Sequence, residues 1–328
     1  MCEKIHVGII GLGAYLPDRV LTNKDLEKMV DTTDEWITTR TGIKERRIAR
    51  ADEATSDMAT EAAKRALNDA GLKAEAIDLI IVATITPDML FPATACLVQD
   101  KIGARTVPAF DISVACSGFI YGLAIANQFI GSGTYRHALV IAAEKLSAIT
   151  DWNDRSTCVL FGDGAAAAVL GPVEKGGILS AYLGANGKQG ELIKLPAGGS
   201  RIPATKKSVD DRLHFIKMNG VELFKHAVKV MAEAALEATR PLGLKAEDIS
   251  LVIPHQANLR ILNAVAKKMG LSKDKIYLNI DKYGNMSAAS SAVALVEAVK
   301  EGRIKKGDKI LLDAFGGGLT WGAIVIEW

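Results

Sequence analysis

Short apolar runs alternate with longer amphipathic segments along most of the chain. Four of the apolar runs predict buried strands, at 78–84, 138–143, 249–254 and 309–314. Segments 55–70 and 221–240 are amphipathic and predict helices, while 161–173 and 319–328 predict closing strands. A strand that is apolar throughout must be covered on both faces. The alternation therefore predicts an α/β protein with helices on both sides of its sheets.

An internal repeat divides the chain in two. GLKAEAIDLII (71–81) and GLKAEDISLVI (243–253) are identical at eight of eleven positions and lie 172 residues apart. The same offset aligns 117–144 with 289–316, and each segment reads as an apolar helix, a glycine-containing loop and an apolar strand. A constant offset over two separated segments indicates duplication. We therefore predict two similar halves, 1–174 and 175–328, packed into one five-layered α-β-α-β-α sandwich.

Two segments fall outside the repeat. Residues 31–58 are polar and rich in charge, and residues 185–217 contain glycine, lysine and proline with weak periodicity. Long irregular stretches within compact domains are usually surface flaps or substrate-binding loops, and we expect that role for both.

Three glycines near the N-terminus suggest a dinucleotide-binding fingerprint. Gly8, Gly11 and Gly13 follow a short apolar stretch, but the third glycine of the motif would fall at Leu16 and Pro17 comes next. No helix can begin there to hold a pyrophosphate, so a turn after an edge strand is the favoured interpretation. A nicotinamide-dependent oxidoreductase stays as an alternative from another enzyme class.

Composition and charge exclude several classes of protein. The 328 residues include 40 basic and 38 acidic side chains, a balance that argues against a dedicated nucleic-acid binder. No run approaches the ~18 apolar residues of a membrane span, and the N-terminal stretch lacks the apolar core of a signal peptide. The four cysteines form no CxxC pair, which makes structural disulfides and a cysteine-based zinc site unexpected. We expect a soluble cytoplasmic enzyme that binds neither membrane nor nucleic acid.

Cys116 is the candidate nucleophile. It lies between an extended segment and a predicted helix, among small residues that permit a tight turn. At such a corner the backbone N–H groups and the helix dipole favour thiolate over thiol. The alternative is a buried structural cysteine, the more common fate of a free thiol and the role we expect for Cys96 and Cys158.

Other candidate residues lie at strand ends or helix starts. His255 ends the second copy of the repeated strand, and Asn285 precedes the helix that the repeat pairs with the Cys116 helix. The turn 316–318 consists of three glycines, whose N–H groups can approach a bound oxygen closely. Taken singly, these residues could be a surface histidine, a helix cap and an ordinary turn. In a sandwich with pseudo-twofold symmetry, however, all of them converge with Cys116 on one central site.

Several stretches together resemble one family over essentially the whole chain. They are GAYLP (13–17), DTTDEWITTRTGI (31–43), the Cys116 corner, RSTCVLFGDGA (155–165), PHQANLRI (254–261), YGNMSAASS (283–291) and FGGGLTWG (315–322). The sequence resembles the thiolase-like condensing enzymes, and among them the β-ketoacyl-acyl carrier protein synthase III family. A Cys-His-Asn triad is typical of that family, whereas elongation synthases resemble Cys-His-His and thiolases Cys-His-Cys.

The resemblance implies a decarboxylative Claisen condensation that initiates fatty acid biosynthesis. Cys116 takes an acyl group from an acyl-coenzyme A, and malonyl-acyl carrier protein then enters. His255 and Asn285 donate hydrogen bonds to the malonyl thioester oxygen, while the backbone N–H groups of Cys116 and Gly317 hold the second oxyanion. The coenzyme A thioester is a substrate, and neither a cofactor nor a metal is implied.

The resemblance also implies binding residues outside the triad. Trp36, Arg40 and Arg155 correspond to contacts of coenzyme A, since an indole and a guanidinium can enclose adenine and an arginine can meet phosphate. Thr32 and Asn258 correspond to positions that line the pantetheine tunnel.

Partner contacts are implied in the same way. Phe91 corresponds to a residue that crosses a homodimer interface and closes the acyl pocket. A basic patch that receives the acidic carrier protein corresponds to Lys225, Arg260, Lys267 and Lys268. Without the resemblance, these cations would be read as a solvated helix face.

Other interpretations stay open. One is a related condensing enzyme of polyketide or quinolone-type biosynthesis with a different primer, and another is a non-catalytic binding protein on the same fold. The primer itself is not specified, because acetyl and branched acyl groups differ by a methylene or two, worth only ~1–3 kcal/mol each in a pocket.

Overall fold

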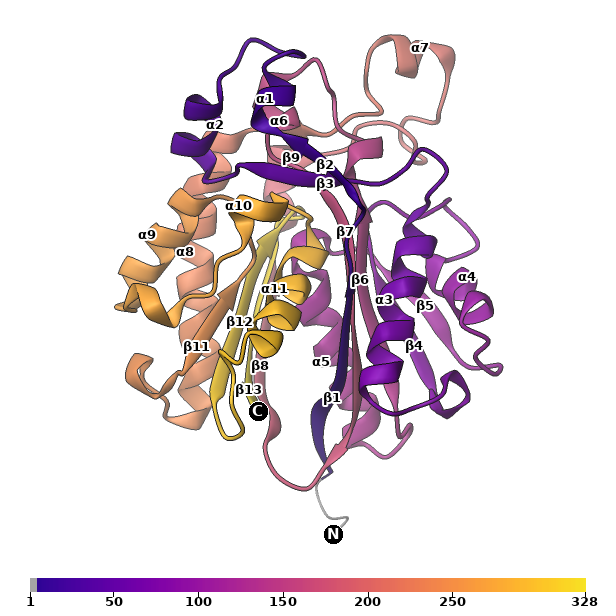
Figure 1. Ribbon diagram of the computed structural model, residues 1–328, viewed down its shortest axis with the longest axis vertical. Coiled ribbons are helices and arrows are strands. Elements are labelled where there is room, and N and C mark those ends of the chain that lie inside the picture. The colour runs from indigo at the N-terminus through magenta and orange to yellow at the C-terminus, as the bar shows by residue number, and fades with distance from the viewer. Residues whose placement is uncertain (1–4) are drawn as a thin grey trace.

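Two β-sheets lie face to face with helices between them and on both outer sides (Figure 1). The structure is a computed structural model that describes residues 5–328. The first sheet has the order β1-β7-β6-β4-β5, with β1 His6–Tyr15, β4 Leu79–Ala83, β5 Ala109–Ile112, β6 Ala138–Lys145 and β7 Asp163–Val173. The second has the order β11-β12-β13-β8, with β8 Gly177–Ala185, β11 Leu251–Pro254, β12 Lys309–Gly316 and β13 Thr320–Glu327. The chain passes from one sheet to the other between Val173 and Gly177.

Two helices fill the layer between the sheets. Helices α5 (Gly118–Gly131) and α11 (Ala288–Lys300) share one hydrophobic core with the inner faces of both sheets. Their first turns approach closely, because a Cβ added at Gly118 would lie 2.7 Å from the Cβ of Ala83 and 3.1 Å from that of Ala288. Glycine at 118 therefore lets the two central helices and β4 meet at one point.

The outer layers complete the sandwich. Helices α3 (Thr55–Asp69) and α4 (Thr94–Lys101) cover the first sheet, and α8 (Gly220–Thr239) and α9 (Leu259–Met269) lie on the side of the second (Figure 1). Alanines on α3 pack against the outer face of the first sheet in a separate core. The five layers and the predicted strands are confirmed. The repeat is visible in the elements too, since β4 begins at Leu79 and β11 at Leu251, 172 residues later.

Short helices and strands cap the carboxyl ends of β4, β6 and β12 (Figure 1). They are β2 Arg19–Thr22, α1 Asn23–Leu26, α2 Asp34–Thr41, β3 Glu45–Ile48, α6 Arg155–Cys158, β9 Ile193–Lys194, α7 Lys206–Asp210, β10 Lys217–Met218 and α10 Ile280–Tyr283. The side chain of Arg46 is fully buried in this cap and donates hydrogen bonds to the Leu21 carbonyl, the Asn23 side chain and the Val159 carbonyl. One guanidinium thus joins three segments of the cap. The segments 31–58 and 185–217 supply much of it.

The N-terminal glycines do not form the predicted turn. They lie inside the ten-residue strand β1, at the edge of the first sheet. A Cβ at Gly11 would lie 2.5 Å from the carbonyl oxygen of Ala66, and one at Gly13 would lie 2.4 Å from that of Ala62. The prediction of a turn is therefore wrong, and Gly11 and Gly13 are required because α3 packs directly on the strand backbone.

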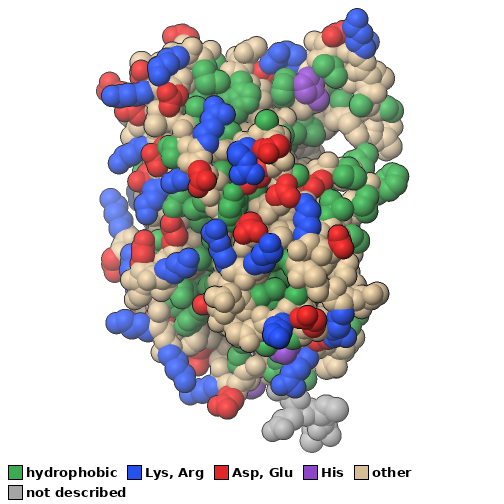
Figure 2. Space-filling model, turned by 45° about the vertical axis from the view of Figure 1, so that its right-hand side comes forward, with side chains coloured by type: hydrophobic (Ala, Val, Ile, Leu, Met, Phe, Trp, Pro, Cys, Tyr) green, Lys and Arg blue, Asp and Glu red, His purple; other side chains and the backbone are tan. Residues whose placement is uncertain are grey.

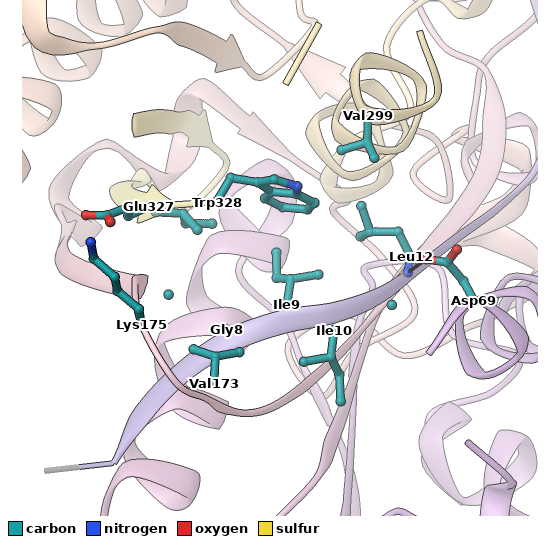
Figure 3. A pocket seen from close by; sticks show the side chains of 13 residues that line it. Gly8, Ile9, Ile10, Leu12, Asp69, Val173, Lys175, Val299, Glu327 and Trp328 are labelled. Atoms are coloured by element: carbon teal, nitrogen blue, oxygen red, sulfur yellow. Dashed lines mark hydrogen bonds between the residues drawn. The ribbon is translucent and has the colours of Figure 1, made fainter. Parts of the chain in front are cut away.

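A pocket of about 180 Å³ lies beside β1, where the two sheets meet (Figure 3). The carboxylates of Asp69 and Glu327 line it together with Lys175, and Asp69 accepts a hydrogen bond from the backbone N–H of Leu12. Two acidic side chains disfavour the pyrophosphate of a dinucleotide. This pocket therefore gives the nicotinamide alternative no support.

The face on the side of α3 and α4 carries lysine, arginine and acidic side chains mixed together (Figure 2). That mixture agrees with the near-neutral net charge of +2. Within residues 5–328 no helix has both the length and the apolar character that crossing a membrane requires.

Candidate active site

Cys116 occupies the corner between β5 and α5. A short 3-10 turn, Ala115–Ser117, leads into the helix, and Ala115 has the left-handed φ of +46°. A Cβ at Gly316 would lie 2.6 Å from the backbone nitrogen of Cys116, so the end of β12 lies directly against the corner. Non-glycine residues in this conformation cost energy and often occur at functional sites. The strained corner therefore supports the choice of Cys116 as the candidate nucleophile.

The corner of the second half has the same backbone. Adding the repeat offset to Ala115 gives Ser287, which also has a left-handed φ, +49°, and precedes α11. Asn285 lies two residues earlier, and its Oδ1 accepts a hydrogen bond of 2.8 Å from the Ser287 N–H. This bond leaves Nδ2 as the amide donor, with no acceptor bonded to it among residues 5–328. Asn285 is thus both the local cap that a single motif suggests and a donor available to a ligand.

His255 lies immediately after β11 and is 2% exposed. Its backbone N–H donates to the Asp313 carbonyl at 2.7 Å, which ties it to β12, the strand that ends at the glycine turn. Burial lowers the pKa of His255 to about 3. The ring is therefore neutral at pH 7, and one of its nitrogens carries a proton that can be donated to an oxygen.

The thiol of Cys116 is not ionised at rest. Burial raises its pKa to about 12 and outweighs the lowering effect of the nearby Ser287 hydroxyl, while the negative charge of Glu144 raises the pKa further. The expectation that the position at the helix start favours thiolate over thiol is therefore wrong for the resting site, because burial outweighs it. The sulfur has to lose its proton when a substrate arrives.

The glycine turn is tied to the Cys116 corner by a residue that sequence analysis did not single out. Thr320 donates its hydroxyl to the carbonyl of Val114 at 2.9 Å and lies 3.0 Å from the carbonyl of Gly317. Within the same turn, a Cβ at Gly317 would lie 3.6 Å from the Cβ of Ala115. The hydroxyl thus holds the turn that carries the proposed oxyanion donor in register with the nucleophile.

Gln256 is a second residue near the site that the sequence motifs did not single out. Its side chain is buried, donates to the carbonyls of Pro254 and Tyr277, and accepts a hydrogen bond from the Asn279 N–H. These three bonds hold the turn that follows β11, and therefore the position of His255. A buried amide directly after a histidine at a strand end is the signal that could have identified it.

Three residues expected at coenzyme A lie together. The guanidinium carbons of Arg40 and Arg155 each lie 4.9 Å from the ring centroid of Trp36, which is the geometry of cation–π contact. Arg155 also donates to the Asp31 carbonyl at 2.7 Å and lines a surface pocket of about 490 Å³. An aromatic face with two cations beside a pocket is suited to a planar base that carries phosphates.

Thr32 and Asn258 lie close to the same cap. The hydroxyl of Thr32 is buried and has no hydrogen-bond partner in the described part of the chain. Asn258 caps α9 by accepting from the Arg260 N–H at 2.8 Å, and its Nδ2 donates to the Arg40 carbonyl at 3.1 Å. Asn258 therefore fastens helix α9 to helix α2, in addition to any contact it makes with a ligand.

The expected carrier-protein contacts are exposed on two adjacent helices. Helices α8 and α9 pack together on the outside of the second half, and they carry Lys225, Arg260, Lys267 and Lys268. Lys225 differs from the others because it forms an ion pair of 2.7 Å with Glu222.

The remaining cysteines and Phe91 differ widely in exposure. Cys158 is buried as expected, but Cys96 is exposed on α4, so its prediction as a buried structural cysteine is wrong. Cys2 lies outside the described residues. Phe91, in the loop between β4 and α4, is 85% exposed. Among residues 5–328 no cluster of three His, Cys, Asp or Glu side chains is placed to hold a metal ion.

Comparisons with known proteins agree along the full length of the chain. The family model described as 3-oxoacyl-[acyl-carrier-protein (ACP)] synthase III matches residues 110–187, and its C-terminal model matches residues 240–328. A β-ketoacyl-[acyl-carrier-protein] synthase III of Caldanaerobacter subterraneus is 64% identical over all of this chain and 99% of that protein. The protein of the same name from Clostridioides difficile is 57% identical over 98% of each chain.

The chain belongs to the β-ketoacyl-acyl carrier protein synthase III family.

Solved structures support the same conclusion. The crystal structure of 3-oxoacyl-[acyl-carrier-protein] synthase III from Aquifex aeolicus covers 98% of this chain and 100% of its own, with 55% identity and a TM-score of 0.92. A priming β-ketosynthase from the R1128 polyketide biosynthetic pathway covers 99% and 97%, at 35% identity and a TM-score of 0.92. The expected thiolase-like fold and family are confirmed. As a member of the synthase III family the protein is an acyl-transferring condensing enzyme. The alternative of a polyketide- or quinolone-type condensing enzyme is not favoured, and neither are the oxidoreductase and non-catalytic alternatives.

Glu144 is the third residue that sequence analysis missed in this synthase III site. It lies near the end of β6, is completely buried, and its Oε2 accepts from Thr86 Oγ1 at 2.7 Å, Ile85 N at 3.1 Å and Thr84 Oγ1 at 3.2 Å. Burial raises its pKa to about 7. A single acid at the end of the apolar run ALVIAAE, at the carboxyl end of a parallel strand, is the signal that marks it.

Proposed function

We propose that this protein condenses an acyl-coenzyme A primer with malonyl-acyl carrier protein, through an acyl-Cys116 intermediate, and so initiates fatty acid biosynthesis. The observation that carries the proposal is the meeting of two equivalent corners. One presents the Cys116 thiol against the glycine turn, and the other presents the Asn285 amide. A nucleophile, a donor pair and an oxyanion site are the components that acyl transfer followed by carbanion formation needs.

In the first half-reaction Cys116 becomes acylated. Its sulfur forms a bond to the carbonyl carbon of the acyl thioester, and the bond from that carbon to the coenzyme A sulfur breaks. Coenzyme A leaves as a thiolate and takes up a proton from solvent. The backbone N–H groups of Cys116 and Gly317 stabilise the oxyanion, which the close packing of the glycine turn on the corner supports.

In the second half-reaction the malonyl group loses carbon dioxide. The bond to the carboxylate carbon breaks, and its electron pair passes into an enolate whose oxygen accepts from Asn285 Nδ2 and His255. Neutral His255 suits this role, because its pKa of about 3 keeps it a hydrogen-bond donor without making it an acid. The enolate carbon then bonds to the acyl carbonyl, and the electron pair of the carbon–sulfur bond returns to Cys116.

The two substrates approach over different parts of the molecule. Coenzyme A lies across Trp36, Arg40 and Arg155, with its pantetheine near Thr32 and Asn258. The acidic carrier protein docks on the basic face of α8 and α9. Support comes from the two cation–π contacts at Trp36 and from the exposure of the basic side chains.

A homodimer completes the acyl pocket in this proposal. Met89, Leu90 and Phe91 are 48%, 81% and 85% exposed, and consecutive apolar side chains with that exposure mark an interaction surface. Phe91 then closes the acyl pocket of the partner chain. A solution mass of two chains checks this part of the proposal.

Intact-protein mass spectrometry tests the central claim. The protein is mixed with acetyl-, isobutyryl- or isovaleryl-coenzyme A, and the modified peptide is mapped. We expect one acyl adduct on Cys116 and a ranking of primers from the labelling rates. Cys96→Ser is the matched control, since it removes the exposed thiol and must leave the adduct unchanged. Cys116→Ser must abolish it, and an adduct that persists in that variant would refute the nucleophile assignment.

A further inference from the structure

Two buried polar atoms near the Cys116 corner have no hydrogen-bond partner among residues 5–328. One is Oε1 of Glu144, whose other oxygen accepts three hydrogen bonds, and the second is Oγ of Ser287. Glu144 is 0% exposed and Ser287 is 2% exposed. A buried polar atom without a hydrogen-bond partner is unfavourable, so two of them in one site call for a functional explanation.

Both atoms lie on the side of Cys116. The alternation of β6 places Glu144 on the inner face with Ala142, and its partner in β7 is Gly164. A Cβ on Gly164 would lie 2.7 Å from the sulfur of Met286, the residue before Ser287. The Ser287 hydroxyl lowers the pKa of both Cys116 and Glu144, although it forms no ideally aligned hydrogen bond with either at rest. On the other side, a Cβ on Gly118 in the first turn after Cys116 would lie 3.1 Å from the Cβ of Ala288, the residue that follows Ser287. Ser287 is thus flanked by one residue packed beside the Cys116 corner and another packed beside the partner of Glu144.

We propose that Glu144 is the proton acceptor for Cys116, reached through the hydroxyl of Ser287. The Cys116 S–H proton passes to Ser287 Oγ as the hydroxyl proton of Ser287 passes to Glu144 Oε1. This leaves a thiolate beside a neutral carboxylic acid, and the thiolate then attacks the acyl carbonyl. Coenzyme A departs as a thiolate and takes its proton from solvent. When condensation releases Cys116, the same path returns the proton from Glu144 to sulfur.

The other titratable groups near Glu144 are not suited to this role. Burial leaves His255 with a pKa of about 3, too low for an efficient base at neutral pH. Lys145 and Asp163 face the opposite side of the sheet, where the ammonium binds the carbonyls of Arg50 and Glu53 and the carboxylate binds Ser147. Among the described residues, Cys116 is the titratable group whose pKa the charge of Glu144 raises. A carboxyl with a pKa near 7 suits proton exchange at neutral pH.

The test is the pH profile of Cys116 alkylation by iodoacetamide, which needs no acyl-coenzyme A. The proposal rests on the proposed function, because the proton path serves the acylation of Cys116. Alkylation does not require condensation, so an absent proton path and an absent condensation activity give different results. In a Cys96→Ser background the rate is expected to rise with pH and level off near pH 7, as Glu144 ionises. In Glu144→Gln the levelling disappears and the rate at pH 8 falls about 100-fold. Glu144→Asp restores the levelling in part.

The opposite result is equally specific. If Glu144 only repels the thiolate, Glu144→Gln lowers the pKa of Cys116 and alkylation becomes faster at every pH. Faster alkylation, or an unchanged profile, overturns the proposal. Asp313→Asn is the control, because Asp313 is also buried with two unpartnered oxygens and a raised pKa, yet it lies on the outer face of β12. Its profile must stay the same.

Ser287→Ala provides a second and independent variant. Alanine is tolerated at the equivalent position 115 with nearly the same φ, so the substitution is expected to preserve the backbone. It removes only the hydroxyl, and the levelling near pH 7 must be lost in it as well. Retention of the levelling in Ser287→Ala excludes the hydroxyl from the path, even if Glu144→Gln fails to fold.

Discussion

The two corners that meet at the centre of the sandwich share a backbone and differ in chemistry. Ala115 and Ser287 are 172 positions apart and have φ values of +46° and +49°, and each precedes a central helix. The first corner presents a half-buried thiol, whereas the second presents a buried amide and a buried hydroxyl. Duplication therefore supplied one backbone geometry twice. A few side chains then make the first corner the nucleophile and the second corner a source of hydrogen-bond donors.

The two halves differ in the same way at the surface. The first half carries Trp36 and two arginines in the cap, a site that suits a nucleotide with phosphates. The second half carries cations along α8 and α9, an extended face that suits a charged protein. Each half thus faces one of the two proposed substrates.

Removing the amide from the second corner is expected to give the largest effect. Asn285→Ala should lower the rate of decarboxylative condensation by at least about 100-fold, since one oxyanion donor is worth 10²–10³ in rate. Self-acylation of Cys116 should change by only a few-fold, because the substitution removes none of the groups that act on the acyl carbonyl in that step, which are the Cys116 sulfur and the N–H groups of Cys116 and Gly317. Single-turnover assays of each half-reaction measure the two rates separately. Equal loss in both steps would remove the division of labour between the corners.

The fold was predictable from sequence because its signals are local and repeated. Apolar runs marked the central strands, and the constant offset between the two copies of the repeat indicated two sheets with a shared middle layer. The glycines of β1 were misread because nothing in the sequence shows that α3 packs within 2.5 Å of the added Cβ positions. The sequence pattern predicted a turn where close packing between distant segments had required glycine.

The site was only partly predictable for a related reason. Motifs predicted Cys116, His255 and Asn285 as the triad, but Glu144 reads as the polar end of a strand until the fold places it on the inner face of the first sheet. The ionisation of Cys116 was also misjudged, since the helix start favours a thiolate while burial raises the pKa to about 12. Burial depends on the packing of both halves and leaves no trace in a short motif.

A smaller effect is expected from the surface of the first half. Trp36→Ala removes the ring that both Arg40 and Arg155 contact, and each cation–π contact is worth ~0.5–1 kcal/mol at an exposed site. The KM for an acyl-coenzyme A should rise about tenfold, with little change in the rate at saturation. Acylation by a short thioester that lacks the nucleotide is the control and should be unaffected. A similar loss with the short thioester would mean that Trp36 supports the cap rather than the substrate.

The smallest expected effect concerns backbone strain, and it tests whether the two corners cost the same free energy as well as sharing one shape. A left-handed conformation costs a non-glycine residue ~1–2 kcal/mol, and glycine loses ~0.5–1 kcal/mol through its greater flexibility when unfolded. Ala115→Gly and Ser287→Gly should therefore each raise the free energy of unfolding by up to about 1 kcal/mol, measured by urea denaturation. The gain should be smaller at 115, because the Cβ of Ala115 lies against the glycine turn and its loss removes a contact. Ser287→Gly alone should also slow alkylation of Cys116, since it removes the hydroxyl. If both variants are less stable than the original protein, packing offsets the strain inferred from the two φ values. The corners would then share a backbone conformation but carry no common strain energy.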